Sequence, residues 1–136
     1  MAALNPTEAE VLVISGSIKR CVFGGSVTQG MALYKDTSDN NHFKPADADV
    51  EASAVVEGIA LCAGEDGQEG TYLANGGVID LGVALTVGTF YYLGLGAGEI
   101  GPLGDLSSGD YITLLGYALT ADNLQLHIIN TGLTVP

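Results

Sequence analysis

Residues 96–101 carry the glycine spacing GxGxxG, which in dinucleotide-binding proteins holds a pyrophosphate at the N-terminus of a helix. That chemistry requires a helix to begin at the third glycine of the motif. Pro102 and Gly104 follow directly, and the next apolar run, residues 111–119, is strand-like rather than helical. We therefore interpret these glycines as residues of a hairpin and predict no bound cofactor.

The two histidines and the densest group of carboxylates are the candidates for metal chemistry. His42 falls in a polar stretch and His127 on the polar side of an alternating strand, and neither has partners at a metal-ligand spacing. The carboxylates gather in one acidic loop: Asp36, Asp39, Asp47, Asp49 and Glu51. The spacing and glycine of an EF-hand are missing there. We predict surface histidines and a solvated loop over residues 36–51, with cation binding as the alternative.

Serine and cysteine supply the potential nucleophiles. Ser15, Ser17 and Ser26 lie near glycines, but none stands in a GxSxG motif and no catalytic triad can be assembled around them. Cys21 and Cys62 are 41 residues apart in apolar, strand-like contexts without a CxxC motif. We interpret them as buried free thiols, and a disulfide between them requires a fold that brings them together. We predict that the protein is not an enzyme.

The charge balance restricts the classes of partner. Sixteen acidic residues face four basic ones, for a formal charge of −12, and Lys19 and Arg20 form the one adjacent basic pair. No basic patch is large enough to neutralise several phosphates, so we predict no binding to nucleic acid. An acidic surface also repels anionic lipid. It favours a partner with a basic or neutral face, or it serves solubility alone.

The composition predicts one globular domain. The chain has 136 residues, of which 47% are apolar and 15% charged, enough for a single buried core. The N-terminus shows no basic region followed by an apolar run, and no apolar run reaches the roughly 20 residues of a membrane helix. We expect no signal peptide, no membrane partner, and synthesis in a cytoplasm.

Short strands separated by turn residues cover most of the chain. The pattern predicts an all-β domain over residues 11–136, a small barrel or sandwich, preceded by an N-terminal arm over residues 1–10. Residues 11–14 and 18–23 are expected to pair as a hairpin across a glycine turn. Asn75-Gly76 is the strongest hairpin signal in the chain and predicts pairing of residues 71–74 with 78–81.

A weak internal repeat relates residues 27–61 to residues 85–119 at an offset of 58 positions. A duplicated β unit is expected to keep identities at strand and turn positions. The identical pairs are Thr28/Thr86, Gly30/Gly88, Tyr34/Tyr92, Asp47/Asp105, Gly58/Gly116, Ala60/Ala118 and Leu61/Leu119. We therefore predict a duplicated strand-loop-strand module whose two copies share one core.

Tyrosine supplies most of the aromatic surface area. Six tyrosines are spread over both copies of the repeat: Tyr34, Tyr72, Tyr91, Tyr92, Tyr111 and Tyr117. Tyrosine tolerates both burial and exposure, and we expect about half of these six to lie in the core and half on a contact surface.

The second copy of the repeat carries a family resemblance. It runs Leu85-Thr-Val-Gly-Thr-Phe-Tyr-Tyr-Leu93, Gly98-Glu-Ile-Gly-Pro102, Gly109-Asp-Tyr-Ile-Thr-Leu-Leu-Gly-Tyr-Ala-Leu119 and Asp122-Asn-Leu-Gln-Leu-His-Ile128. This pattern resembles the small decoration, or cement, proteins of tailed-phage heads, and related modules occur in phage fibre and tail proteins. The resemblance covers residues 84–130 well and residues 27–61 weakly.

The resemblance implies a structural role in a virion. Such proteins are β-rich, often homotrimeric, and clamp neighbouring subunits of the major capsid protein on the capsid exterior, where N-terminal arms often reach the shell. Expected contacts to the capsid or to other copies are Ala2, Ala3, Leu4, Asn5, Pro6, Tyr34, Tyr91, Tyr92 and Tyr117. The alternative is a phage fibre, tail or glycan-binding recognition module, because exposed tyrosines suit stacking on sugars.

Overall fold

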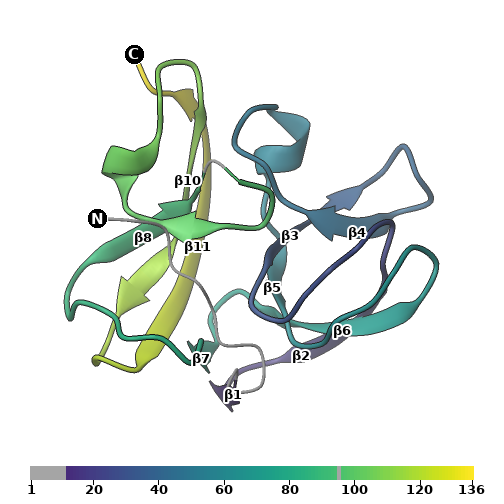
Figure 1. The fold of residues 1–136 in the computed structure, drawn as a ribbon, viewed down its shortest axis with the longest axis horizontal. Helices are drawn as coiled ribbons and strands as arrows, with labels where there is room; N and C mark the ends of the chain where they lie inside the picture. The colour runs from purple at the N-terminus through teal and green to yellow at the C-terminus, as the bar shows by residue number, and fades with distance from the viewer. Residues whose placement is uncertain (1–11, 95) are drawn as a thin grey trace.

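The protein is all-β and consists of two antiparallel sheets. The computed structural model describes residues 12–94 and 96–136, which contain eleven strands and two short 3-10 helices (Figure 1). Sheet A has the order β1-β7-β11-β10-β8-β9 and sheet B the order β2-β6-β5-β3-β4. The arrangement is that of a small β-sandwich rather than a closed barrel, which confirms the all-β prediction.

The strands are short and follow the apolar runs of the sequence. Sheet A is built from β1 (Leu12–Ser15), β7 (Val78–Asp80), β8 (Phe90–Leu93), β9 (Ile100–Gly101), β10 (Tyr111–Ala118) and β11 (Asn123–Thr134). Sheet B is built from β2 (Ile18–Val22), β3 (Ala32–Asp36), β4 (His42–Pro45), β5 (Gly58–Ala60) and β6 (Glu69–Ala74). The 3-10 helices are η2 (Ala52–Ala54) and η3 (Leu103–Asp105), both in segments without strand periodicity.

The main core lies between the two sheets. Sheet B contributes Ile59 and Leu73, and sheet A contributes Tyr91, Leu124 and Leu126, all buried in one cluster. In each sheet these side chains alternate with outward-facing ones, as the pleat of a strand requires. Burying each large apolar side chain contributes roughly 1.5–3 kcal/mol. One shared core therefore stabilises both sheets together.

A second, smaller cluster fills the far side of sheet B. Phe23 and Phe43 are joined by an isolated parallel bridge, which brings the edges of β2 and β4 together and curls the sheet. The Phe43 and Tyr72 rings lie with centroids 4.8 Å apart. Phe23 is completely buried, and a Cβ at Gly64 or Gly70 would overlap its ring. These two glycines make room for the aromatic centre of the cluster.

The two sheets repeat the same strand order and register. The order β4-β3-β5-β6-β2 in sheet B matches β9-β8-β10-β11-β7 in sheet A, where β1 is added at the edge. Leu33 pairs with Gly58 in sheet B, and Tyr91 pairs with Gly116, each 58 positions later, in sheet A. The repeat seen in the sequence thus corresponds to strands that occupy equivalent places in the two sheets.

Hydrogen bonds of the turns also recur at the same offset. The amide of Gly30 donates to Ala60 O at 2.8 Å, and the amide of Gly88 donates to Ala118 O at 3.0 Å. Both glycines have positive φ, 88° and 80°, which glycine adopts without strain. The turn before β3 and the turn before β8 are therefore built in the same way.

Both predicted hairpins are wrong. β1 pairs with β7 in sheet A, whereas β2 pairs with β6 in sheet B, so the chain changes sheet at residues 15–17. At Asn75-Gly76 the chain crosses back, because β6 pairs with β2 and β5 while β7 pairs with β1 and β11. The two crossings pack closely, since a Cβ at Gly16 would overlap the Cα of Gly77. Gly16 allows this close approach because a side chain there would overlap the neighbouring backbone. In the sequence, glycines that serve such a crossing look the same as the glycines of a hairpin turn.

Candidate assembly surface

The side of sheet A that faces away from the core is predominantly apolar. We call it the outer face; it comprises Leu12, Ile14, Val78, Asp80, Phe90, Tyr92, Leu114, Tyr117, Gln125, His127 and Ile129. Strand register places most of these side chains in two rows. One row is Phe90-Tyr117-Gln125-Val78 and the other is Tyr92-Leu114-Ile129. Directly opposite residues in antiparallel strands share one face, so each row is continuous across the sheet.

Strand alternation explains why these residues point outwards. In β8, Tyr91 and Leu93 are buried in the core, so Phe90 and Tyr92 lie on the other side of the strand. Phe90 is 53% exposed, and its ring meets that of Tyr117 edge-on at 6.0 Å between centroids. On β11, Ile129 is 45% exposed. Because contiguous apolar surfaces are typical of contact sites, this face is the candidate contact surface of the described chain.

Charge is nearly absent from these strands. Among the described strands of sheet A the sequence contains one acidic residue, Asp80, and neither lysine nor arginine. Asp80 lies at one end of the sheet, opposite Leu12 and Asn123, and its Oδ1 accepts a hydrogen bond from the Gly82 amide at 2.8 Å. Besides Asp80, the outer face holds one histidine, His127. The outer face therefore differs from the rest of a chain whose formal charge is −12.

The predicted contact tyrosines divide between surface and core. Tyr92 and Tyr117 are half-buried on the outer face, and Tyr34 is half-buried on β3 of sheet B. Tyr91 is only 1% exposed, and its hydroxyl accepts a hydrogen bond from the Thr86 amide at 3.0 Å. The prediction of Tyr91 as a surface contact is therefore wrong for this chain. Tyr91 points inwards because side chains alternate along β8 and sheet B covers the side on which Tyr91 lies.

The aliphatic members of the outer face and Phe90 were missed as site residues. Phe90 and Ile129 are among its most exposed large side chains. The alternation of residues 124–128 was a usable signal for the orientation of β11, but nothing local indicated which side of β8 is exposed. The five arm residues predicted as contacts, residues 2–6, lie outside the described residues.

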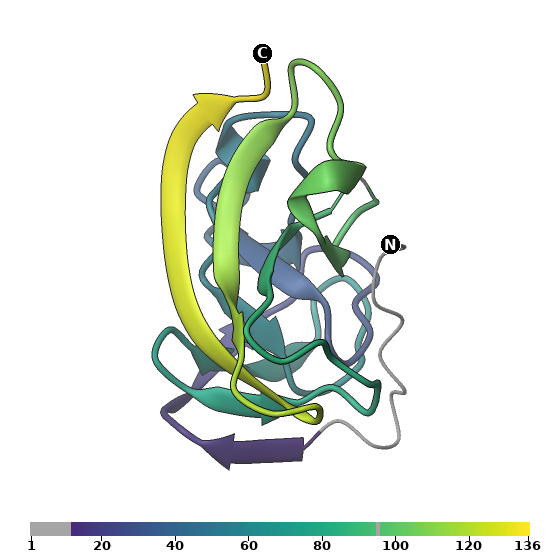
Figure 2. The same cartoon turned by 90° about the vertical axis from the view of Figure 1, so that its left-hand side faces the viewer.

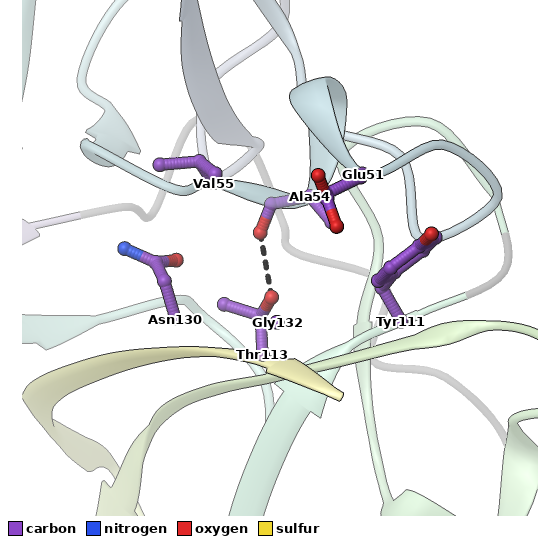
Figure 3. A pocket seen from close by; sticks show the side chains of 7 residues that line it. All are labelled: Glu51, Ala54, Val55, Tyr111, Thr113, Asn130 and Gly132. Atoms are coloured by element: carbon purple, nitrogen blue, oxygen red, sulfur yellow. Dashed lines mark hydrogen bonds between the residues drawn. The ribbon is translucent and has the colours of Figure 1, made fainter. Parts of the chain in front are cut away.

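A cavity of about 220 Å³ lies where η2 approaches the β10–β11 hairpin (Figure 3). It is lined by Glu51, Ala54, Val55, Tyr111, Thr113, Asn130 and Gly132. Thr113 is buried and its hydroxyl donates to Ala54 O at 2.6 Å, the dashed contact in Figure 3. The Asn130 Oδ1 accepts from the Val56 amide at 2.9 Å. These two hydrogen bonds connect the β10–β11 hairpin to the segment around η2. Among the residues that line the cavity, Glu51 carries the one carboxylate.

The first part of the acidic loop is a paired hairpin. The segment is the β3–β4 turn, in which Asn40 and Asn41 adopt positive φ. The Lys44 ammonium lies 2.8 Å from Asp36 and 3.1 Å from Asp39. Hydrogen bonding from Lys44 lowers the pKa of Asp36 to about 2. His42, predicted as a surface histidine, is half-buried and lies 3.9 Å from Asp39. The single charge of Lys44 therefore offsets part of the negative charge of these two carboxylates.

The second part of the loop carries unneutralised carboxylates. The charge of Asp47, together with hydrogen bonding and charge from Asp110, raises the pKa of Asp49. Asp110 is buried and accepts a hydrogen bond from the Ser107 amide at 2.8 Å. Within residues 12–94 and 96–136, no three histidine, cysteine or acidic side chains are arranged to hold a metal ion. The carboxylates of Asp47 and Asp49 therefore repel one another electrostatically.

The two cysteines and the glycine motif take part in packing and in a turn. Cys21 is buried and Cys62 half-buried, and both thiols are free. Burial, with a smaller effect of Cys62, raises the pKa of Cys21 to about 11. Gly94, just before the glycine motif, donates its amide to O of Glu99 within the motif at 2.8 Å, and β8 pairs with β9 as a hairpin. The structure thus confirms the interpretation of that motif as a hairpin.

Comparisons with family models, with curated proteins and with solved structures found no match to this chain. Within the part of the chain that the structure describes, no helix has the length and apolar character needed to span a membrane.

Proposed function

We propose that this protein is a structural component of a tailed-phage virion, which decorates the outside of the capsid and clamps adjacent subunits of the major capsid protein. The observation that carries the proposal is the outer face of sheet A, a continuous apolar surface on a small rigid scaffold. Phe90 and Ile129 are exposed on this face beside the half-buried Tyr117, and aromatic residues are enriched at protein interfaces. The resemblance of residues 84–130 to decoration proteins supports the same assignment.

A small protein stabilises a large shell through several linked contacts. Each contact of one copy with the capsid is modest, but connected copies bind with a much higher effective affinity. A two-sheet fold with one core suits this role because its surface keeps its shape under load. The predicted homotrimer and the arm over residues 1–10 would supply such linked contacts.

The distribution of charge supports a position on the capsid exterior. A formal charge of −12 repels nucleic acid phosphates, so contact with packaged DNA is unfavourable. Carboxylates concentrate in loops and turns, including residues 36–51, 65–69 and 105–110, which leaves the outer face free for protein contact. The proposal therefore places the acidic loops toward solvent.

A phage fibre or glycan-recognition module is the second candidate function. The edge-on pair of Phe90 and Tyr117 beside the Gln125 amide favours it, because aromatic rings with a neighbouring hydrogen-bonding group suit sugar recognition. This reading predicts a saturable change in tyrosine fluorescence on titration with oligosaccharides.

The decisive experiment looks for the chain in virions. Mass spectrometry and cryo-electron microscopy of virions from the phage that encodes it should show ordered copies on the outside of the head. Capsids assembled without it should recover their resistance to heat or chelators when the purified protein is added back. Virions without the chain, together with saturable oligosaccharide binding, would favour the recognition module instead.

A further inference from the structure

We infer that the cavity between η2 and the β10–β11 hairpin holds the side chain of an arginine from a partner protein (Figure 3). The inference deepens the proposed function and rests on it for its biological setting, in which the partner is the major capsid protein. None of the seven residues that line the cavity belongs to the outer face, so this contact is separate from that surface. The size of the cavity, its polar groups and the charge around it carry the argument.

The size of the cavity suits one amino-acid side chain. Its volume of about 220 Å³ lies below the roughly 300–1,000 Å³ that is typical of sites for drug-sized ligands. Ala54 and Val55 line it from the η2 segment, and Tyr111 lines it from β10. Val55 is 45% exposed, so apolar surface continues from the cavity to solvent. The aliphatic stem of a long side chain can pack along these residues while its charged end reaches the polar groups.

The polar groups of the lining are chiefly acceptors of hydrogen bonds. The Thr113 hydroxyl donates its one proton to Ala54 O, so its oxygen can only accept further bonds. The Asn130 Oδ1 accepts from the Val56 amide and retains a second lone pair, and its Nδ2 faces Val56 O at 3.5 Å. Glu51 adds a carboxylate, which accepts on both oxygens. A guanidinium, with its N–H donors and no acceptor, complements this set, whereas an anion does not.

The charge around the cavity is negative and is not offset. Glu51 belongs to the same loop as Asp47 and Asp49, and the Tyr111 amide donates to Ala48 O at 2.8 Å, which holds this loop against the cavity wall. In the described part of the chain, none of the ion pairs involves Glu51, Asp47 or Asp49. The charge of Asp47 raises the pKa of Asp49, as expected where negative charge lacks a counter-charge. The loop therefore attracts a cation to the cavity.

Arginine fits this site better than lysine. Figure 3 shows Tyr111 and Asn130 at opposite ends of the cavity, with Glu51 and Thr113 between them. A planar guanidinium spreads its donors over several such acceptors and stacks on an aromatic ring, whereas an ammonium is a compact, strongly hydrated point charge. We expect the guanidinium to lie on the Tyr111 ring and to donate to Glu51, with the other two side chains as further acceptors.

The test titrates the purified full chain with a blocked arginine, N-acetyl-arginine-N-methylamide, at constant salt, and follows the NMR signals of the protein. Signals of residues that line the cavity, such as Val55, Tyr111 and Asn130, should shift saturably. The blocked citrulline, which has nearly the same shape and no charge, should cause no saturable shift. The blocked lysine should bind more weakly than the blocked arginine.

A charge-removing variant tests the role of the cavity's carboxylate. Glu51→Gln should weaken binding of the blocked arginine roughly five-fold, because a charge-assisted contact is lost. Glu51 is exposed, so the circular dichroism of this variant should match that of the wild type. Glu69→Gln is the matched control: it removes the same charge from a side chain that is 77% exposed and outside the lining, and it should bind like the wild type.

Each of three results would overturn the inference: no saturable shift of the lining residues with the blocked arginine, an equal response to the blocked citrulline, or unchanged binding by Glu51→Gln. Equal binding of the blocked lysine would contradict the assignment to arginine, because a general attraction of cations would then explain the shifts.

The outcomes for the two proposals are distinguishable. Arginine binding in this cavity by a chain that is missing from virions would leave the inference standing and remove the proposed function. A chain found on capsids whose cavity does not respond to the blocked arginine would do the reverse.

Discussion

Gly116 and its counterpart Gly58 show how single residues connect the sequence repeat to the fold. A Cβ on Gly116 would overlap the carbonyl oxygen of Gln125, and a Cβ on Gly58 would overlap the carbonyl oxygen of Leu73. Each glycine sits inside a strand where a neighbouring backbone approaches too closely for any side chain. Neither has a positive φ, so the requirement is space rather than backbone conformation.

Gly116→Val should lower the free energy of unfolding by roughly 2–4 kcal/mol, since strands β10 and β11 must separate to admit the side chain. Denaturant unfolding followed by circular dichroism measures the change. Gly104→Val is the control, because a Cβ at Gly104 meets nothing within 4 Å. Equal stability of the two variants would show that the close approach at Gly116 is not required.

At the scale of elements, the β10–β11 hairpin links the two layers. It forms the centre of sheet A, and β11 extends along one side of the molecule (Figure 2). Its inner side reaches the segment around η2 through the cross-strand neighbours Thr113 and Asn130, which both line the cavity in Figure 3. The same hairpin presents Leu114, Tyr117 and Ile129 on the outer face. Its position therefore affects both the core and the proposed contact.

Thr113→Val should destabilise the protein by about 1–2 kcal/mol, because the shape is kept while Ala54 O loses its buried hydroxyl partner. Amide exchange around residues 54–56 should become faster as the segment loosens. The matched variant Thr134→Val changes an exposed threonine at the end of the same hairpin and should have little effect. Unchanged exchange in Thr113→Val would mean that packing alone holds η2 in place.

At the scale of the whole molecule, the two repeated sheets are interdependent. Leu73 on β6 and Leu124 on β11 are both completely buried in the same cluster. The chain passes between the sheets twice, at residues 15–17 and 75–77. Sheet B is formed by strands within residues 18–74, whereas sheet A combines β1 with strands that follow residue 77. Neither sheet can bury its inner side without the other, so we expect them to unfold as one unit.

Leu73→Ala and Leu124→Ala should each shift one common unfolding transition, with a loss of roughly 2–5 kcal/mol from the cavity that each creates. Scanning calorimetry of the two variants measures this. Leu133→Ala, at a residue that is 65% exposed, should leave the transition almost unchanged. Two separate transitions, each sensitive to only one of the buried substitutions, would show that the sheets fold independently.

Local features of the sequence determined the strands but not their partners. The alternation of residues 124–128, the apolar run at 111–119 and the glycine turn before residue 100 all correspond to observed elements. These features depend on neighbours within a few residues, which the sequence displays directly. Strand pairing depends on residues far apart in the chain. For that reason the turn signals at residues 15–17 and 75–76 predicted hairpins where the chain changes sheet.

The amino-acid sequence alone determined an acidic, all-β chain with a repeat at an offset of 58 positions. It also determined that the strand residues of the two rows carry no charge. Tertiary structure decided which side of each strand is covered. Tyr91 and Tyr92 are consecutive tyrosines with the same intrinsic preferences, yet one is buried and the other reaches the outer face. That difference arises because sheet B covers only one side of β8, and no local property of the sequence specifies which side it covers.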